Sequence, residues 1–222
     1  AELGVAAADS DRVIDERIGE PIEGWFDREG ERAFRALEEE VVLGLLADPD
    51  ARVIALGGGA LASEPVRAAL AEHTVVHVEV SAEVAWRRAS GRGRPLARDR
   101  ARFEQLFADR AAVYAAAADA TLPATASKGA ARRATPALEA LRAARATVGG
   151  RPRMVWADAA SGSYPVFFGR GLHAAGFEHP TDGRRLTVTD TDVAAALGVS
   201  RAIAIDPGET AKNLATVERV LG

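Results

Sequence analysis

Residues 53–60, VIALGGGA, form an apolar strand followed by three consecutive glycines, and this stretch decides the fold. A strand that is apolar on both faces is typical of a parallel sheet covered by helices. A helix is predicted at about 64–72, since Pro65 fits a first helical turn. A tight turn usually needs one glycine, whereas three in a row let the backbone approach a ligand and present N–H groups to it. The run therefore favours a binding loop over a simple turn.

Strands and helices alternate on both sides of this loop. One predicted strand ends at Asp9, and three others cover residues 53–56, 74–80 and 119–123. The predicted helices cover residues 11–18, 31–47, 64–72 and 103–118, and a further helix begins in SAEVAWRRA at 81–89 with Ser81 as its N-cap. This alternation predicts an α/β fold in which helices flank a parallel sheet. Residues 90–102 are rich in arginine and contain glycine and proline, and we interpret them as a mobile loop.

The composition excludes several classes of function. The 222 residues carry a net charge of −4, whereas nucleic-acid-binding proteins usually show a basic surface. The absence of cysteine excludes disulfides, iron–sulfur clusters and thiolate zinc sites. The sequence contains neither an apolar run of about 18 residues nor the pattern of a signal peptide. We therefore expect a cytoplasmic protein that binds neither nucleic acid nor membranes.

The composition changes after the fourth predicted strand. Residues 126–152, rich in alanine, arginine and glycine, are interpreted as a linker with a weak helix near 136–146, between a domain at 1–125 and a second domain at 153–222. The second domain begins with two strands joined by a polar turn and continues with alternating strands and helices. Because the alternation stops after so few elements, we expect this second α/β domain to be incomplete.

Two acidic residues, Asp9 and Asp11, follow the first predicted strand and flank Ser10. Open parallel sheets bind ligands at the carboxyl ends of their strands, so these carboxylates are well placed for a metal ion or a substrate hydroxyl. The alternative is structural, with Asp11 as the N-cap of the helix at 11–18. The residues alone leave both interpretations open.

Three arginines stand out by position, Arg35, Arg94 and Arg110. A guanidinium is always charged and binds carboxylate or phosphate groups as a rigid fork. Each of the three could equally be a solvated surface residue. Arg94 lies in the loop with glycine and proline, which could close over a phosphorylated ligand.

Five motifs in this order resemble shikimate kinase over residues 1 to about 123. They are DSD at 9–11, GEPIEGWFDREGERAFRALEEEV at 19–41, VIALGGGA at 53–60, GRGRPL at 91–96 and DRAAVY at 109–114. The resemblance implies a P-loop-kinase-like fold. It also implies transfer of a phosphoryl group from ATP, with Mg²⁺, to the 3-hydroxyl of shikimate in the chorismate pathway of aromatic amino acid biosynthesis.

The resemblance also implies roles for individual residues. Asp11 would hold the reacting hydroxyl, and Arg35 and Arg110 would clamp the shikimate carboxylate. Arg94 would meet the ATP phosphates and the migrating group. The remaining implied contacts are Gly57, Gly58 and Gly59 lining the pocket, Phe34 under the ring of the substrate, and Asp9 positioning Mg²⁺ through water.

One departure concerns the start of the family pattern. The family's first strand and P-loop precede the position at which this sequence begins, and no GKS or GKT occurs within it. In the family's strand order, 2-3-1-4-5, the first strand is central. We therefore expect two unpaired inner strand edges, a segment of a longer protein, and a segment that is inactive alone. The alternative is a pseudokinase that binds shikimate without turnover.

The second domain resembles the start of 3-dehydroquinate synthase, an NAD-dependent, phosphate-eliminating cyclase. The motifs are SYPVFFGRGL at 163–172, VTDTDVA at 188–194 and DPGETAKNLATVERV at 206–220. The resemblance implies an incomplete α/β nucleotide-binding domain with NAD contacts at Asp190, Glu209 and Lys212, and a divalent metal in the complete enzyme. Together the two resemblances predict a bifunctional kinase–synthase, with the rest of the same polypeptide on both sides.

Overall fold

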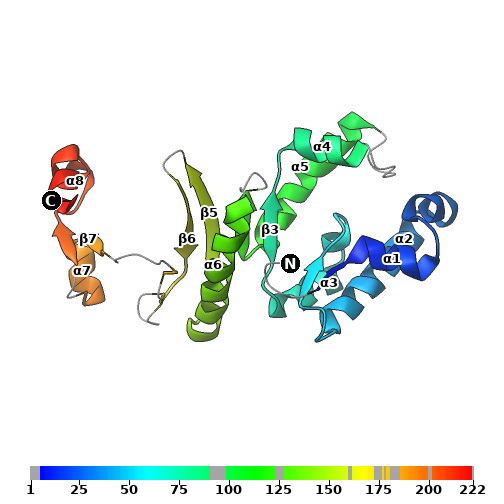
Figure 1. The fold of residues 1–222 in the computed structure, drawn as a ribbon, viewed down its shortest axis with the longest axis horizontal. Helices are drawn as coiled ribbons and strands as arrows, with labels where there is room; N and C mark the ends of the chain where they lie inside the picture. Colours follow the sequence, from blue (N-terminus) through cyan, green and yellow to red (C-terminus); the bar gives the residue numbers. More distant parts are fainter. Residues whose placement is uncertain are drawn as a thin grey trace. The chain divides into compact units, whose positions relative to one another are not determined.

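The computed structural model describes residues 6–90, 99–123, 128–159, 162–172, 177, 179–180, 186–199 and 202–221. The chain forms two compact units, Ala1–Arg170 and Gly171–Gly222. Figure 1 labels the helices α1 to α8 and the strands β3, β5, β6 and β7, and each unit is described by itself.

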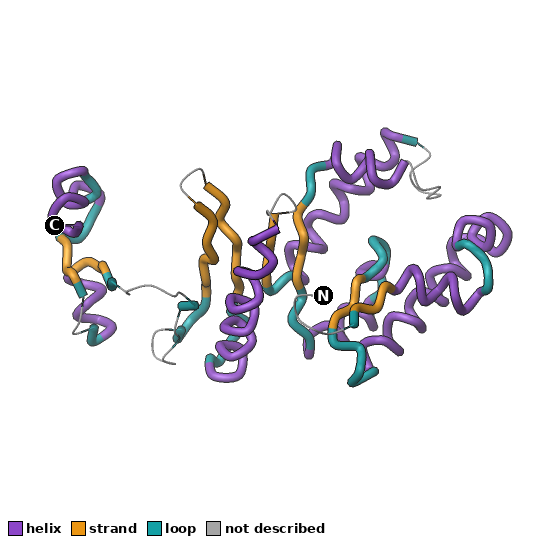
Figure 2. Tube along the Cα trace, viewed as in Figure 1, coloured by secondary structure: helices purple, strands orange, loops and turns teal. Residues whose placement is uncertain are grey.

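The first unit contains two sheets (Figure 2). β1 (Ala7–Asp9) and β2 (Val53–Ala55) form a parallel pair. The larger sheet has the order β3 (Val76–Glu79), β4 (Ala120–Pro123), β5 (Arg153–Ala159) and β6 (Gly162–Phe168). β3, β4 and β5 are parallel, and β6 returns antiparallel to β5 as a hairpin.

Helices connect and cover these strands. They are α1 (Ser10–Ile18), α2 (Ile22–Ala47), α3 (Glu64–Ala69), α4 (Ala82–Ser90), α5 (Arg100–Ala117) and α6 (Lys128–Thr147), with short 3-10 turns η1 (Ala60–Ala62) and η2 (Leu70–Glu72). The predicted helix at 31–47 is present, but α2 begins at Ile22. Gly30, with φ of 86°, breaks the helical geometry between the two parts.

The predicted α/β class, with parallel strands flanked by helices, is confirmed. Among the described residues, no strand lies between β2 and β3. An apolar cluster connects the two sheets instead: its buried members are Val42, Ala60, Leu61, Val66 and Leu70, and Leu56, Val75 and Tyr114 pack against it.

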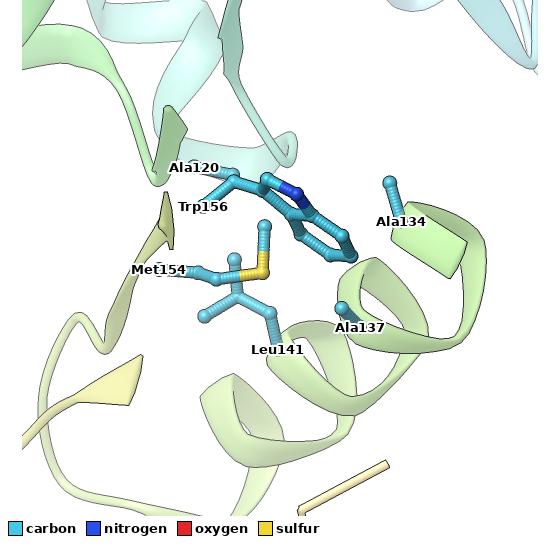
Figure 3. Packing of buried hydrophobic residues seen from close by; sticks show 6 residues of the cluster. All are labelled: Ala120, Ala134, Ala137, Leu141, Met154 and Trp156. Atoms are coloured by element: carbon cyan, nitrogen blue, oxygen red, sulfur yellow. The ribbon is translucent and has the colours of Figure 1, made fainter. Parts of the chain in front are cut away.

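α6 packs against the larger sheet (Figure 3). The buried residues of this contact are Ala120, Ala134, Ala137, Leu141, Met154 and Trp156. The predicted linker at 126–152 thus contains a 20-residue helix that belongs to this apolar cluster, which we call the first core. The small side chains of Ala134 and Ala137 lie beside Trp156 on the packed face of α6. The predicted boundaries at 125/126 and 152/153 differ from the division after Arg170.

A buried carboxylate, Asp119, strengthens the same junction. Its side chain is fully buried and accepts hydrogen bonds from Val75 N (2.8 Å), Arg145 Nη1 (3.1 Å) and Arg151 Nε (2.5 Å). A buried charge is tolerated when it is paired and hydrogen-bonded, as Asp119 is. Arg145 also donates to His73 O at 2.6 Å. These bonds connect α6 and the start of β5 to β3 and β4.

The second unit contains a parallel pair of strands, β7 (Val188–Asp190) and β8 (Ile203–Ile205). α7 (Thr191–Leu197) connects them, and η4 (Glu209–Ala211) and α8 (Leu214–Leu221) follow. Asp190 caps α7, since its Oδ1 accepts a hydrogen bond from Val193 N at 2.7 Å. In the part of the chain that the structure describes, no helix is both long and apolar enough to cross a membrane.

Candidate active site

The glycine loop follows β2 and leads into η1. Gly57 and Gly59 are buried, and Gly58 is exposed. Two backbone hydrogen bonds shape the turn, from Ala60 N to Gly57 O (3.1 Å) and from Ala62 N to Gly59 O (2.9 Å). The loop therefore lies at the carboxyl end of a parallel strand, the edge at which open α/β sheets bind ligands.

Asp11 faces this loop from the first turn of α1. The helix cap is Asp9, whose Oδ1 accepts a hydrogen bond from Asp11 N at 3.0 Å. The alternative that Asp11 is the N-cap is therefore wrong. A Cβ atom at Gly57 would overlap Asp11 Oδ1, so only glycine allows the carboxylate to approach the backbone this closely.

Arg35 and Glu38 reach the same loop from one face of α2. Arg35 Nη1 donates to Glu38 Oε2 at 2.5 Å, and the Glu38 side chain is 4% exposed. A Cβ atom at Gly59 would overlap the Arg35 guanidinium, and one at Gly57 would lie 2.9 Å from Glu38 Oε1. A carboxylate on one edge of the guanidinium fixes its plane, so Glu38 orients Arg35 over the loop.

Phe34 precedes Arg35 but belongs to an apolar cluster with Ile14 and Val41. Its side chain is buried, and its ring centroid lies 5.5 Å from that of Phe26. The Arg35 Cζ lies 5.3 Å from the Phe34 ring centroid, within the range of a cation–π contact. Phe34 thus supports Arg35, while its contact with a substrate ring stays a prediction.

α5 brings Arg110 and Tyr114 to the third side of the loop. A Cβ atom at Gly58 would lie 3.3 Å from Arg110 Nη1, and Tyr114 Oη donates to Gly58 O at 2.6 Å. Both side chains also line an open cleft of about 310 Å³ between α4 and α5, whose other lining side chains are apolar apart from Arg88. Arg110 therefore borders both the glycine loop and a space open to a ligand.

The arrangement places two carboxylates, Asp11 and Glu38, and two guanidinium groups, Arg35 and Arg110, around three glycines. Since Glu38 is paired with Arg35, it compensates part of the positive charge. The site can bind a small anion through the guanidinium groups while the Asp11 carboxylate accepts a proton or a hydrogen bond from a hydroxyl.

At the surface, at a distance from the glycine loop, ion pairs shift the pKa values of Glu20 and Arg100. A hydrogen bond from Arg28 lowers the pKa of Glu20, and hydrogen bonds to Glu104 and Glu83 raise the pKa of Arg100. Glu20 lies between α1 and α2, and Arg100 is the first residue of α5, so these pairs stabilise helix ends.

The other predicted site residues lie elsewhere. Arg94 falls within 91–98, outside the described residues. Asp190 caps α7 in the second unit, and in the same unit Lys212 Nζ pairs with Glu209 Oε1 at 2.5 Å. Both of these side chains are largely exposed.

Three residues of the site were not predicted from the sequence: Ser10, Glu38 and Tyr114. Glu38 follows Arg35 by three residues, the spacing at which side chains meet on a helix, so this signal was available. Ser10 and Tyr114 act through hydrogen bonds to residues about 50 positions away, which no local pattern indicates.

Comparison with known proteins agrees with this geometry. A family model described as shikimate kinase matches residues 1–141. This chain belongs to the shikimate kinase family. The match extends into α6, beyond residue 123, where the sequence resemblance was expected to end.

Individual shikimate kinases give the same result. The enzyme of Mycobacterium avium (strain 104) is 48% identical over 120 residues, which are 52% of this chain and 68% of that enzyme. The Salinispora arenicola (strain CNS-205) enzyme is 46% identical over 123 residues, 54% of this chain and 73% of that enzyme. The match to a Mycobacterium tuberculosis (strain ATCC 25177 / H37Ra) shikimate kinase covers 65% of that protein.

Solved structures share the fold. Shikimate kinase from Acinetobacter baumannii in complex with shikimate superimposes with a TM-score of 0.55 and 30% identity, covering 64% of this chain and 81% of that one. The shikimate kinase from Bacteroides thetaiotaomicron gives a TM-score of 0.54 at 24% identity, covering 62% and 86% respectively, and supports the fold alone.

Proposed function

We propose that this chain takes part in phosphorylating the 3-hydroxyl of shikimate with ATP. The observation that carries the proposal is the convergence of Asp11, Arg35 and Arg110 on the glycine loop at Gly57–Gly59. These residues come from three helices and meet at one strand end. The Acinetobacter baumannii relative, whose structure contains shikimate, supports the choice of substrate.

In the proposed complex, the guanidinium groups of Arg35 and Arg110 bind the shikimate carboxylate. Two forked cations fix the orientation of a planar anion, and Glu38 holds the plane of Arg35. Gly58 is the exposed glycine of the loop, and its lack of a side chain lets the ring of the substrate approach closely. Binding the carboxylate at one end places the hydroxyl groups of the ring at the Asp11 end of the loop.

In the reaction that we propose, the oxygen of the shikimate 3-hydroxyl bonds to the γ-phosphorus of ATP while Asp11 accepts the proton of that hydroxyl. The bond from that phosphorus to the bridging oxygen breaks, and ADP leaves. Such transfers depend mainly on positioning and on neutralising charge. Arg94 would neutralise the migrating group.

Mg²⁺ enters this reaction with ATP as part of the substrate. The part of the chain that the structure describes holds no group of three acidic or histidine side chains that could bind a metal. Mg²⁺ often uses one or two carboxylates together with substrate phosphates and water, so this finding is compatible with the proposal. Oδ1 of Asp9 caps α1, so the contact of Asp9 with Mg²⁺ through water would use its other carboxylate oxygen.

The test is shikimate-dependent release of ADP by the intact gene product, compared with its Asp11→Asn variant. We expect Asp11→Asn to reduce turnover by about 100-fold or more, because the amide cannot accept the proton, with little change in ATP affinity. Unchanged turnover would refute the role of Asp11. Calorimetry with shikimate addresses the pseudokinase alternative: binding without any ADP release would favour a binding module.

For the second unit, residues 171–222, we propose a nucleotide-binding segment similar to that of 3-dehydroquinate synthase, on the strength of the sequence resemblance at 188–194 and 206–220. The parallel strands β7 and β8 support an α/β nucleotide-binding half, since Asp190 is the last residue of β7 and the Glu209–Lys212 turn comes after β8. NAD titration monitored by fluorescence tests it. Binding that Asp190→Ala weakens would support the proposal, and no binding by the intact gene product would refute it.

A further inference from the structure

We propose that Ser10 is a positioning residue for the phosphoryl transfer, because its hydroxyl holds the glycine loop against the helix that carries Asp11. This inference rests on the proposed function. Ser10 is the first residue of α1 and lies between the capping Asp9 and Asp11.

A single buried hydrogen bond carries the proposal. Gly57 N donates to Ser10 Oγ at 2.8 Å, and Ser10 is completely buried. β1 and β2 pair up to Asp9 and Ala55. The bond from Gly57 to Ser10 therefore continues the connection between the two chain segments beyond the point at which the strands end.

The bond matters because of what surrounds Gly57. The backbone of Gly57 lies so close to both carboxylates that an added Cβ atom would overlap Asp11 Oδ1 and would lie 2.9 Å from Glu38 Oε1. The position of Gly57 thus limits where both carboxylates can lie. Catalytic groups lose about 100-fold in rate when displaced by about 1 Å, so a small movement of the loop would affect the proton acceptor.

The other side of the loop has an independent anchor. Tyr114 Oη donates to Gly58 O at 2.6 Å, next to Arg110. Without the Ser10 bond the loop would remain held on the Arg110 side and be released on the Asp11 side. We therefore expect loss of Ser10 to affect the chemical step more than the binding of the substrate carboxylate.

The experiment compares Ser10→Thr with Ser10→Val in the intact gene product. Threonine and valine have nearly the same volume, but only threonine keeps a hydroxyl that can accept the hydrogen bond from Gly57 N. We expect Ser10→Val to lower kcat by about 10-fold to 100-fold relative to Ser10→Thr, with KM for shikimate changed by less than about threefold. Shikimate affinity and melting temperature are measured on the same samples.

Ser63→Ala serves as the matched control for stability. Ser63 caps α3, accepting from Val66 N at 3.2 Å and donating to Glu39 Oε2 at 2.6 Å. Its loss should lower the melting temperature, as Ser10→Val does, while kcat stays unchanged. An equal kcat for the threonine and valine variants, or an equal fall in kcat for Ser63→Ala, would overturn the inference. Absence of shikimate-dependent ADP release in the unmodified protein would overturn the proposed function as well.

Discussion

Gly59 offers the sharpest test of the carboxylate clamp, through the substitution Gly59→Ala. The added Cβ would overlap the Arg35 guanidinium and lie 2.6 Å from Cζ and 3.0 Å from Nη2. Those atoms are the far end of a flexible side chain, so Arg35 would move while the backbone stays. The substitution therefore removes a functional group from its place without truncating it.

The magnitude follows from the interaction that is lost. A hydrogen bond to a charged group contributes about 1.5–3 kcal/mol, so displacement of Arg35 should weaken shikimate binding by about 10-fold to 150-fold. The fold should also lose stability, because displacement of Arg35 takes the hydrogen bond from the Glu38 carboxylate, whose side chain is 4% exposed, so affinity is compared on folded protein. Affinity for an ATP analogue should stay unchanged.

The assay is isothermal titration calorimetry with shikimate and with its methyl ester. The ester has no carboxylate charge, so the penalty of Gly59→Ala should shrink when the ester replaces the acid. Gly44→Ala is the control, since nothing lies within 4 Å of a Cβ atom at Gly44 in α2. Normal shikimate affinity in folded Gly59→Ala protein, or an equal penalty for acid and ester, would refute the clamp.

Three further predictions concern the site, the core and the surface. Arg110→Ala should weaken shikimate binding far more than ATP binding, measured by calorimetry; an equal loss of both would exclude a specific carboxylate contact. Leu141→Ala should lower the free energy of unfolding by about 2–5 kcal/mol in denaturant titrations, because Leu141 is fully buried in the first core, whereas a linker residue would cost almost nothing. Glu20→Gln should lower the melting temperature slightly at neutral pH, because Arg28 lowers the pKa of Glu20; the difference from the unmodified protein should vanish as the pH falls through that lowered pKa, and a difference that persists in acid would contradict it.

The parts of the fold that could be predicted from the sequence are those with local signals. The apolar strand before Gly57 and the helical spacing from Phe34 to Leu45 indicated elements that the structure contains. The start of α2 at Ile22 was missed although Ile22, Trp25 and Phe26 have helical spacing and pack in the apolar cluster around Phe34. Gly30 interrupts the helical pattern between this first part of α2 and the predicted helix at 31–47.

The role of α6 could not be predicted, because its packing depends on a distant partner. Alanines at 134 and 137 carry little hydrophobic signal alone, and only contact with Trp156 on β5 shows that they are buried. The connection of Asp119 to Arg145 and Arg151 is likewise formed by residues 26 and 32 positions apart. The local composition of residues 126–152 therefore indicates a linker where the structure has a packed helix.

The candidate site divides in the same way. The carboxylate, the arginines and the glycines have chemistry that is visible in the sequence. Their mutual placement is not, since Asp11 and Gly57 are brought together by the pairing of β1 with β2. Ser10 and Tyr114 could be recognised only from the hydrogen bonds that they make, whereas the spacing of Glu38 from Arg35 is visible in the sequence.

The most direct test of the account is the reaction itself. The intact gene product is incubated with Mg²⁺–ATP and increasing concentrations of shikimate, ADP release is followed, and the product is examined by phosphorus NMR. If the protein phosphorylates the 3-hydroxyl of shikimate, we expect saturable, shikimate-dependent ADP release and a phosphate on the 3-oxygen of shikimate. Absence of shikimate-dependent ADP release, or a phosphate on another oxygen, would contradict it.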